Sequence, residues 1–210
     1  LLDADVSPET VAREILWPLS EQLAHQYRTD ELGMLEHHYA VQLMRSLVDQ
    51  LQLRYETGPA RGREVLMFSG PERLNELAGQ LMADLLEADG YGVRFGGGGI
   101  AEDDILAEVG RLRPDVLLMF ASSPSDAPVI RAVIDKVRAV DACPDMQIVV
   151  AGGVFNRAEG LAEEIGADLW ATTPGELLER LEVDATRRAE AGQRTVGRHR
   201  TAKTSQRDAA

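Results

Sequence analysis

The stretch DVLLMFASS at residues 115–123 is an apolar run that ends in two serines. A short run that is apolar at every position is typical of a strand buried on both faces, which occurs in parallel sheets covered by helices. Four further apolar runs lie at residues 64–68, 91–95, 147–151 and 167–172. Helical stretches alternate with these runs, at residues 74–88, 103–112, 127–140, 157–165 and 175–181. The alternation predicts an α/β domain with a five-stranded parallel sheet and helices on both faces.

The chain before residue 58 has helical periodicity instead. Ser7-Pro8-Glu9 is a predicted helix start, because a hydroxyl cap, a proline at the first helical position and an early acid each favour one. Pro18 is expected to kink this helix or to open a second one. A long helix is predicted from about residue 32 to residue 55. Its apolar face is expected to comprise Leu35, Tyr39, Leu43, Met44, Leu47 and Leu51.

These patterns divide the chain into four parts. Residues 1–57 are expected to form a helical bundle, residues 58–62 a linker, and residues 63–183 the sheet domain. Residues 184–210 form a basic tail, in which from Arg187 onward seven basic residues face two acidic ones. Its content of Ala, Gly, Thr and Ser predicts disorder.

Charge and cysteine content exclude several classes of protein. The 22 basic and 35 acidic residues give a net charge of −13, which repels nucleic-acid phosphates and anionic membrane faces. We therefore expect no direct nucleic-acid binding, and no apolar run approaches the roughly 20 residues of a membrane helix. Cys143 is the only cysteine, so a disulfide framework and a cysteine-based metal site are excluded and a cytoplasmic location is expected.

The carboxyl ends of the predicted strands are the expected ligand site. Ligands of open parallel sheets bind outside these ends, and here they carry glycines and hydroxyls. The candidate cofactor contacts are Gly97, Gly98, Ser122, Ser123, Gly152, Gly153 and Thr172. Serine hydroxyls can bond a polar heterocycle, and a glycine pair lets a flat ring approach the backbone. The alternative is ordinary turn chemistry, because Ser and Gly are common in strand–helix turns.

Other ligand classes fit these strand ends less well. A receiver domain needs an aspartate after the third strand and a lysine after the fifth, where this chain has Ser122 and Thr172. A dinucleotide fingerprint needs its glycines after the first strand of a βαβ unit, whereas the glycines at 96–99 follow the second predicted strand.

The same positions resemble those of cobalamin-binding modules, which consist of a helical bundle followed by a flavodoxin-like domain. That family carries a serine after the third strand and a glycine pair after the fourth, as Ser122 and Gly152-Gly153 do here. Residues 166–178 and 85–93 also resemble the family, so the likeness spans about residues 8–182. It implies a cobalamin cofactor, such as adenosylcobalamin, held between the bundle and the sheet.

One motif departs from that family. Its Asp-x-His-x-x-Gly motif after the first strand supplies a histidine beneath the cobalt, but this chain has Asn75 at the matching position. No histidine lies between His38 and His199. An asparagine is a poor cobalt ligand, so the resemblance implies a cobalamin that keeps its own base or a water on the metal. A different tetrapyrrole, such as heme, is the alternative.

The helical segment resembles light-sensing cobalamin regulators. These carry a tryptophan and, about ten residues later, a Glu-His pair over the upper corrin face; here Tyr27 and His37-His38 hold those positions. We expect His38 to face the cavity and to cap or ligate the metal, since imidazole suits late first-row metals. The alternative is two partly exposed histidines on an amphipathic helix.

The resemblance implies a non-enzymatic sensory module that responds to light. It would change its oligomeric state, as a homo-oligomer, or its contacts with a regulatory protein. Some relatives of this type also hold a linear bilin, so biliverdin is a possible second chromophore. The alternatives are a heme sensor, a corrinoid-carrier subunit of a methyltransferase, and an interaction domain that has lost its ligand. Nucleophilic triads and partnered acid pairs are absent from the sequence patterns.

Overall fold

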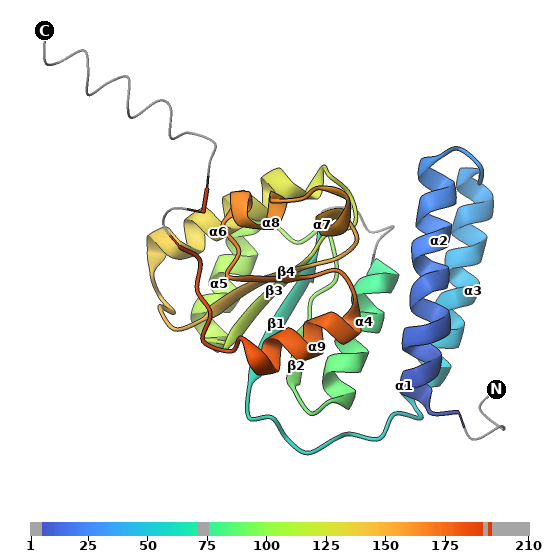
Figure 1. The fold of residues 1–210 in the computed structure, drawn as a ribbon, viewed down its shortest axis with the longest axis horizontal. Coiled ribbons are helices and arrows are strands. Elements are labelled where there is room, and N and C mark those ends of the chain that lie inside the picture. Colours follow the sequence, from blue (N-terminus) through green and yellow to red (C-terminus); the bar gives the residue numbers. More distant parts are fainter. Residues whose placement is uncertain (1–5, 71–75, 191–192, 195–210) are drawn as a thin grey trace, which may run out of the picture.

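The computed structural model describes residues 6–70, 76–190 and 193–194. Within them the strands form one parallel sheet in the order β2-β1-β3-β4-β5 (Figure 1). The strands are β1 (Glu64–Ser69), β2 (Gly92–Phe95), β3 (Val116–Phe120), β4 (Gln147–Ala151) and β5 (Leu169–Ala171). The predicted five-stranded α/β architecture is therefore confirmed.

Helices cover both faces of the sheet, as expected. One face packs against α4 (Glu76–Ala88), α9 (Pro174–Val183) and the N-terminal helices. The other face packs against α5 (Glu102–Leu112), α6 (Asp126–Val140), α7 (Val154–Arg157) and α8 (Leu161–Ile165). The stretch expected as one helix at 157–165 is instead α7 and α8, because Gly160 turns the chain with a φ of 77°.

Two separate cores explain the unbroken apolar strands. Met67 and Leu118 belong to the core beneath α4 and α9, whereas Leu66 and Leu117 belong to the core beneath α5 and α6. Successive side chains of a strand point to opposite faces, so each central strand needs apolar residues at every position.

The N-terminal helices form a hairpin that stands beside the sheet (Figure 1). It consists of α1 (Pro8–Val11), the π-helical segment η2 (Ala12–Leu16), α2 (Trp17–Arg28) and α3 (Met34–Gln52). Ser7 caps α1 as predicted, accepting from the Thr10 N–H. The wider turn of η2 comes just before Pro18, which lacks the N–H that an α-helix needs there.

The expected apolar face of α3 is only partly correct. Of its six members, Met44 and Leu51 are buried, together with Val48 and His37. Leu35, Tyr39, Leu43 and Leu47 are all more than half exposed. The helix carries apolar residues on two sides, and only the side that meets α2, α4 and η2 is covered within the described residues.

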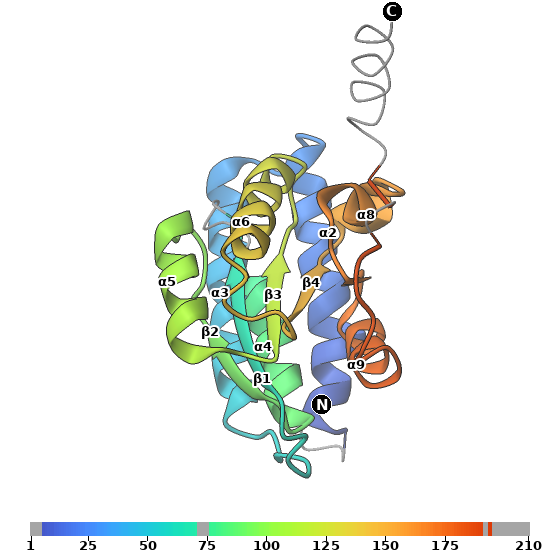
Figure 2. The same cartoon turned by 90° about the vertical axis from the view of Figure 1, so that its left-hand side faces the viewer.

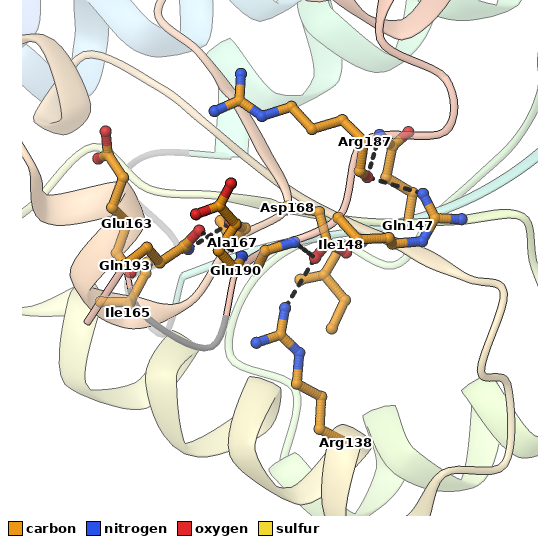
Figure 3. Close-up of polar contacts among 12 residues, drawn as sticks. Arg138, Gln147, Ile148, Glu163, Ile165, Ala167, Asp168, Arg187, Glu190 and Gln193 are labelled. Carbon is orange, nitrogen blue, oxygen red and sulfur yellow. Dashed lines mark hydrogen bonds and ion pairs between the residues drawn. The ribbon is translucent and has the colours of Figure 1, made fainter.

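The segment after α9 was predicted to be a disordered tail over residues 184–210, of which residues 191–192 and 195–210 lie outside the described part of the chain. Residues 184–190 and 193–194 do not behave as a free tail but lie along the amino edge of the sheet (Figure 3). The Gln147 side-chain amide donates to the Asp184 and Arg187 carbonyls at 2.9 and 3.2 Å. Buried Asp168 accepts from the Arg138 guanidinium and the Ala189 N–H. These long-range bonds between the tail and buried side chains explain why a local reading of composition missed the segment.

The connection between the hairpin and the sheet is also held in place. Residues 53–63 form no helix or strand, and the Gly58 N–H donates to the Ala88 carbonyl at 2.7 Å.

Among the described residues, none of the helices is long and apolar enough to cross a membrane.

Candidate functional site

The carboxyl ends of the strands meet the tip of the hairpin. In Figure 2, α2 and α3 run alongside the sheet, and the loop between them lies beyond the strand ends. The lower part of the hairpin is anchored in the core, where Trp17 packs edge-to-face on Phe120 at 6.2 Å between ring centroids. The upper part of the hairpin therefore overhangs the edge where the sequence predicted a ligand.

A small cavity of about 30 Å³ lies between the hairpin and the sheet domain. Its walls come from α2, α3, α4 and the loop after β3. The lining residues are Ser20, Glu21, Leu23, Ala24, His37, Val41, Met44, Leu77, Ala78 and Ser122. That volume accommodates about one water molecule.

Ser122 lies in the wall of this cavity, and its hydroxyl makes no hydrogen bond to a described residue. The residue is 7% exposed, and its Oγ is buried without a hydrogen-bond partner among the described residues. Its backbone is fully engaged, because the Ser122 and Ser123 N–H groups donate to Asp126 Oδ2 and the Ser122 carbonyl accepts from Arg157 at 2.6 Å. Buried hydroxyls are rarely left unpaired, so this hydroxyl in the cavity wall is available to a water molecule or to a polar group of a ligand.

The glycine pair after β4 has structural reasons of its own. Gly152 has a φ of 118°, and a Cβ there would lie 2.0 Å from the Ala121 carbonyl oxygen. A Cβ on Gly153 would lie 2.6 Å from a carboxylate oxygen of Glu21 on α2. The first glycine therefore lets β3 and β4 approach at their ends. At Gly153 the neighbouring atom is the end of a flexible side chain, so a Cβ there would displace Glu21 and not the backbone.

Four other candidate contacts are used locally and do not line the cavity. The Thr172 hydroxyl and N–H donate to Glu176 Oε2, which ties the end of β5 to α9. Gly98 donates to Glu76 Oε1, and the Gly97 carbonyl accepts from the Ser69 N–H. The Ser123 hydroxyl shares a hydrogen bond with Ser125 at 2.7 Å. Their cofactor roles stay predictions.

The two histidines occupy different surroundings, and the expected orientation of His38 is wrong. His37 is the one that lines the cavity; it is 5% exposed and stacks on Tyr27 with ring centroids 4.5 Å apart. His38 is exposed. Burial, and secondarily the nearby His38 charge, lowers the pKa of His37, so its imidazole is neutral near pH 7. The metal-ligand role assigned to His38 stays a prediction.

A second hollow of about 400 Å³ lies at the hairpin tip. It is lined by Tyr27, Met34, Leu35, His37 and His38. His37 and its partner ring therefore separate this surface hollow from the cavity over the sheet. Among the described residues, no three His, Cys, Asp or Glu side chains are close enough together to hold a metal ion. Asn75 lies outside the described residues.

Sequence reasoning missed three residues at this edge. Ser69, at the end of β1, has a buried hydroxyl without a partner, and a Cβ on Gly79 would lie 2.5 Å from it. Glu21 and Arg157 reach the strand ends from α2 and α7. A serine after the first apolar run was a visible signal, but the long-range contacts of Glu21 and Arg157 leave no local pattern.

Solved structures of corrinoid and cobalamin-binding proteins are similar to this structure. The monomethylamine corrinoid protein of Methanosarcina barkeri has 16% sequence identity and a TM-score of 0.76 over 87% of this chain and 86% of that chain. The chain shares its fold with corrinoid proteins. A cobalamin-binding protein from Desulfitobacterium hafniense DCB-2 has 14% identity and a TM-score of 0.53 over 78% of this chain and 76% of that chain.

The corrinoid-protein fold includes the N-terminal helical part, because the first of these likenesses extends over most of both chains. The flavodoxin-like prediction is thereby confirmed. No protein-family model and no curated protein sequence matches the chain.

Proposed function

We propose that this chain binds a corrinoid, with cobalamin as the first choice, between the hairpin tip and the carboxyl edge of the sheet. The observation that carries the proposal is the buried, unpartnered Ser122 hydroxyl in the wall of the cavity. The corrinoid-protein fold supports the same ligand class. Ser122 would bond the polar part of the ligand, with the backbone at Gly152 beside it.

The residues fit a corrinoid only if the hairpin tip moves. A cavity of about 30 Å³ cannot hold a macrocycle. The hairpin is anchored at its base by Trp17, Met44, Val48 and Leu51, whereas His37 is the single buried residue of its upper half. Opening the tip would expose the partly buried Leu23 and Val41, while the fully buried residues of the base keep the two parts together.

The proposed role is sensory and non-enzymatic: a chemical change in the bound ligand alters how the hairpin packs against the sheet domain. When bound, an alkylcobalamin supplies a light-labile cobalt–carbon bond. The neutral His37 imidazole would meet the upper side of the ligand, and its stack on Tyr27 would pass a change in the ligand to the hairpin tip. A neutral imidazole is also a common heme ligand, which makes a heme sensor the second candidate.

The test is a spectral titration in the dark. The full chain is titrated with adenosylcobalamin, methylcobalamin, hydroxocobalamin, heme and biliverdin, and each mixture is measured again after green light. We expect saturable corrin binding, a spectral change after light with the alkyl forms, and weaker binding by Ser122→Ala. Ser125→Ala, in the same loop but exposed, is the matched control.

The outcomes separate the candidates. Corrin binding without a change beyond that of free cobalamin in light would contradict the sensory role and favour a carrier subunit. If heme alone binds tightly, the ligand of this site is heme and not a corrinoid. A protein that retains none of these ligands would refute the proposal.

A further inference from the structure

Helix α3 presents a second apolar face to solvent. Five large apolar side chains on it are between 51% and 74% exposed. They are Met34, Leu35, Tyr39, Leu43 and Leu47. The last four recur at every fourth residue and form a stripe about 18 Å long, which we call the α3 stripe.

Most of the α3 stripe lies away from the buried face. Met44, Val48 and Leu51 pack toward the core, and a rotation of 100° per residue puts Leu35 and Tyr39 on the far side of the helix. The same rotation puts Leu43 on the flank of the helix and Leu47 beside the buried face. An amphipathic helix of a folded domain normally turns polar residues to that side. A contiguous patch of large apolar side chains on a folded protein marks an interaction surface.

The charge around the stripe favours a second copy of this chain as the occupant. The chain has a net charge of −13, so two copies repel each other over most of their surfaces. On one side the stripe is bordered by the uncharged side chains Gln42, Ser46 and Gln50. The acid nearest to it, Glu36, already accepts a hydrogen bond from the Gly33 N–H at 2.9 Å. Two copies can therefore meet on this face without acid facing acid.

The spacing of the stripe is self-complementary as well. We propose that α3 packs antiparallel against α3 of a second copy across a two-fold axis, with Leu35 opposite Leu47 and Tyr39 opposite Leu43. Every member of the stripe then meets an apolar partner, as an isologous interface requires. The two α3 helices then cover each other's exposed apolar side chains, and each α2 lies on the opposite side of its own α3.

The hollow at the hairpin tip fits the same arrangement. Met34 and Leu35 line this space of about 400 Å³ at one end of the stripe. In the antiparallel register, Leu47 of the second copy lies over Leu35, at the rim of this hollow. The surface argument uses no property of the corrinoid site, so the dimer stands or falls independently of the proposed function.

The experiment is sedimentation velocity on the full chain from about 1 to about 100 μM, without added ligand. We expect a dimer for the parent protein, and at least a tenfold weaker dimerisation constant for Leu43→Glu. Val140→Glu is the matched control, since Val140 is 65% exposed at the end of α6, away from the stripe, and its dimerisation should be unchanged. Circular dichroism checks that each variant folds.

The register is tested separately by cross-linking. A Leu35→Cys, Leu47→Cys variant in a Cys143→Ser background should form covalent dimers on mild oxidation, whereas Leu35→Cys alone in that background should form few. A parent chain that stays monomeric throughout the range would overturn the proposal. A folded Leu43→Glu variant that dimerises as well as the parent would do the same.

Discussion

Replacing Ser122 by alanine is expected to change stability and corrinoid affinity in opposite directions. The Ser122 hydroxyl is buried without a partner, and such a group costs roughly 1–3 kcal/mol of folding free energy. Its removal should therefore raise the free energy of unfolding by about 1 kcal/mol, or Tm by about 2–4 °C. If the hydroxyl bonds the ligand, the same change loses about 0.5–1.5 kcal/mol of binding, which weakens Kd by roughly 2- to 13-fold.

Two measurements on one pair of variants test this reasoning. Thermal unfolding of the ligand-free protein gives the stability change, and spectral titration with cobalamin gives the affinity. Ser125→Ala is the control for both, because its side chain is exposed and bonds only within the loop. A Ser122→Ala variant that is destabilised without ligand, or that binds cobalamin as tightly as the parent, would refute the role given to this hydroxyl.

Three further predictions follow from single residues. Burial raises the pKa of Asp84 to about 6, above its value of 3.8 in an unfolded chain, so stability should fall by about 3 kcal/mol between about pH 4 and pH 6. The free energy of unfolding, measured with urea across that pH range, should no longer fall with pH in Asp84→Asn. An unchanged pH dependence in this variant would contradict the role given to Asp84. Gly152→Ala should cost at least about 2 kcal/mol, measured by urea unfolding, because its Cβ would meet the Ala121 carbonyl at a φ of 118°; a neutral effect would mean that the backbone differs there. His37→Ala should alter the spectrum of bound corrinoid more than His38→Ala, because His37 lines the cavity and His38 is exposed; the reverse result would support the predicted ligand role of His38.

The sheet was predictable because its signal is local. Short apolar runs such as residues 116–121 are typical of strands that are buried on both faces, and the structure places β3 there. The position of the site followed from the same pattern, since parallel strands bring their carboxyl ends to one edge. Ser122 was found in this way, and the structure adds that its hydroxyl is unpaired.

The remaining features depend on contacts between distant segments. Helix α3 has two apolar sides, and its sequence does not say which of them meets α4, so His38 was expected in the cavity in place of His37. The segment after Val183 has the composition of a free tail, but Gln147 and Asp168 hold it through bonds across tens of residues. Periodicity and composition carry no information about such pairs.

Hydrogen–deuterium exchange with and without cobalamin tests the central claim most directly, because it reports both binding and its location. We predict slower exchange at the loops after β3 and β4, near Ser122 and Gly152, and altered exchange at the hairpin tip around His37. The base of the hairpin, near Val48, should not change. Unaltered exchange throughout the chain, or protection confined to the amino edge around Asp168, would contradict a corrinoid site between the hairpin and the carboxyl edge of the sheet.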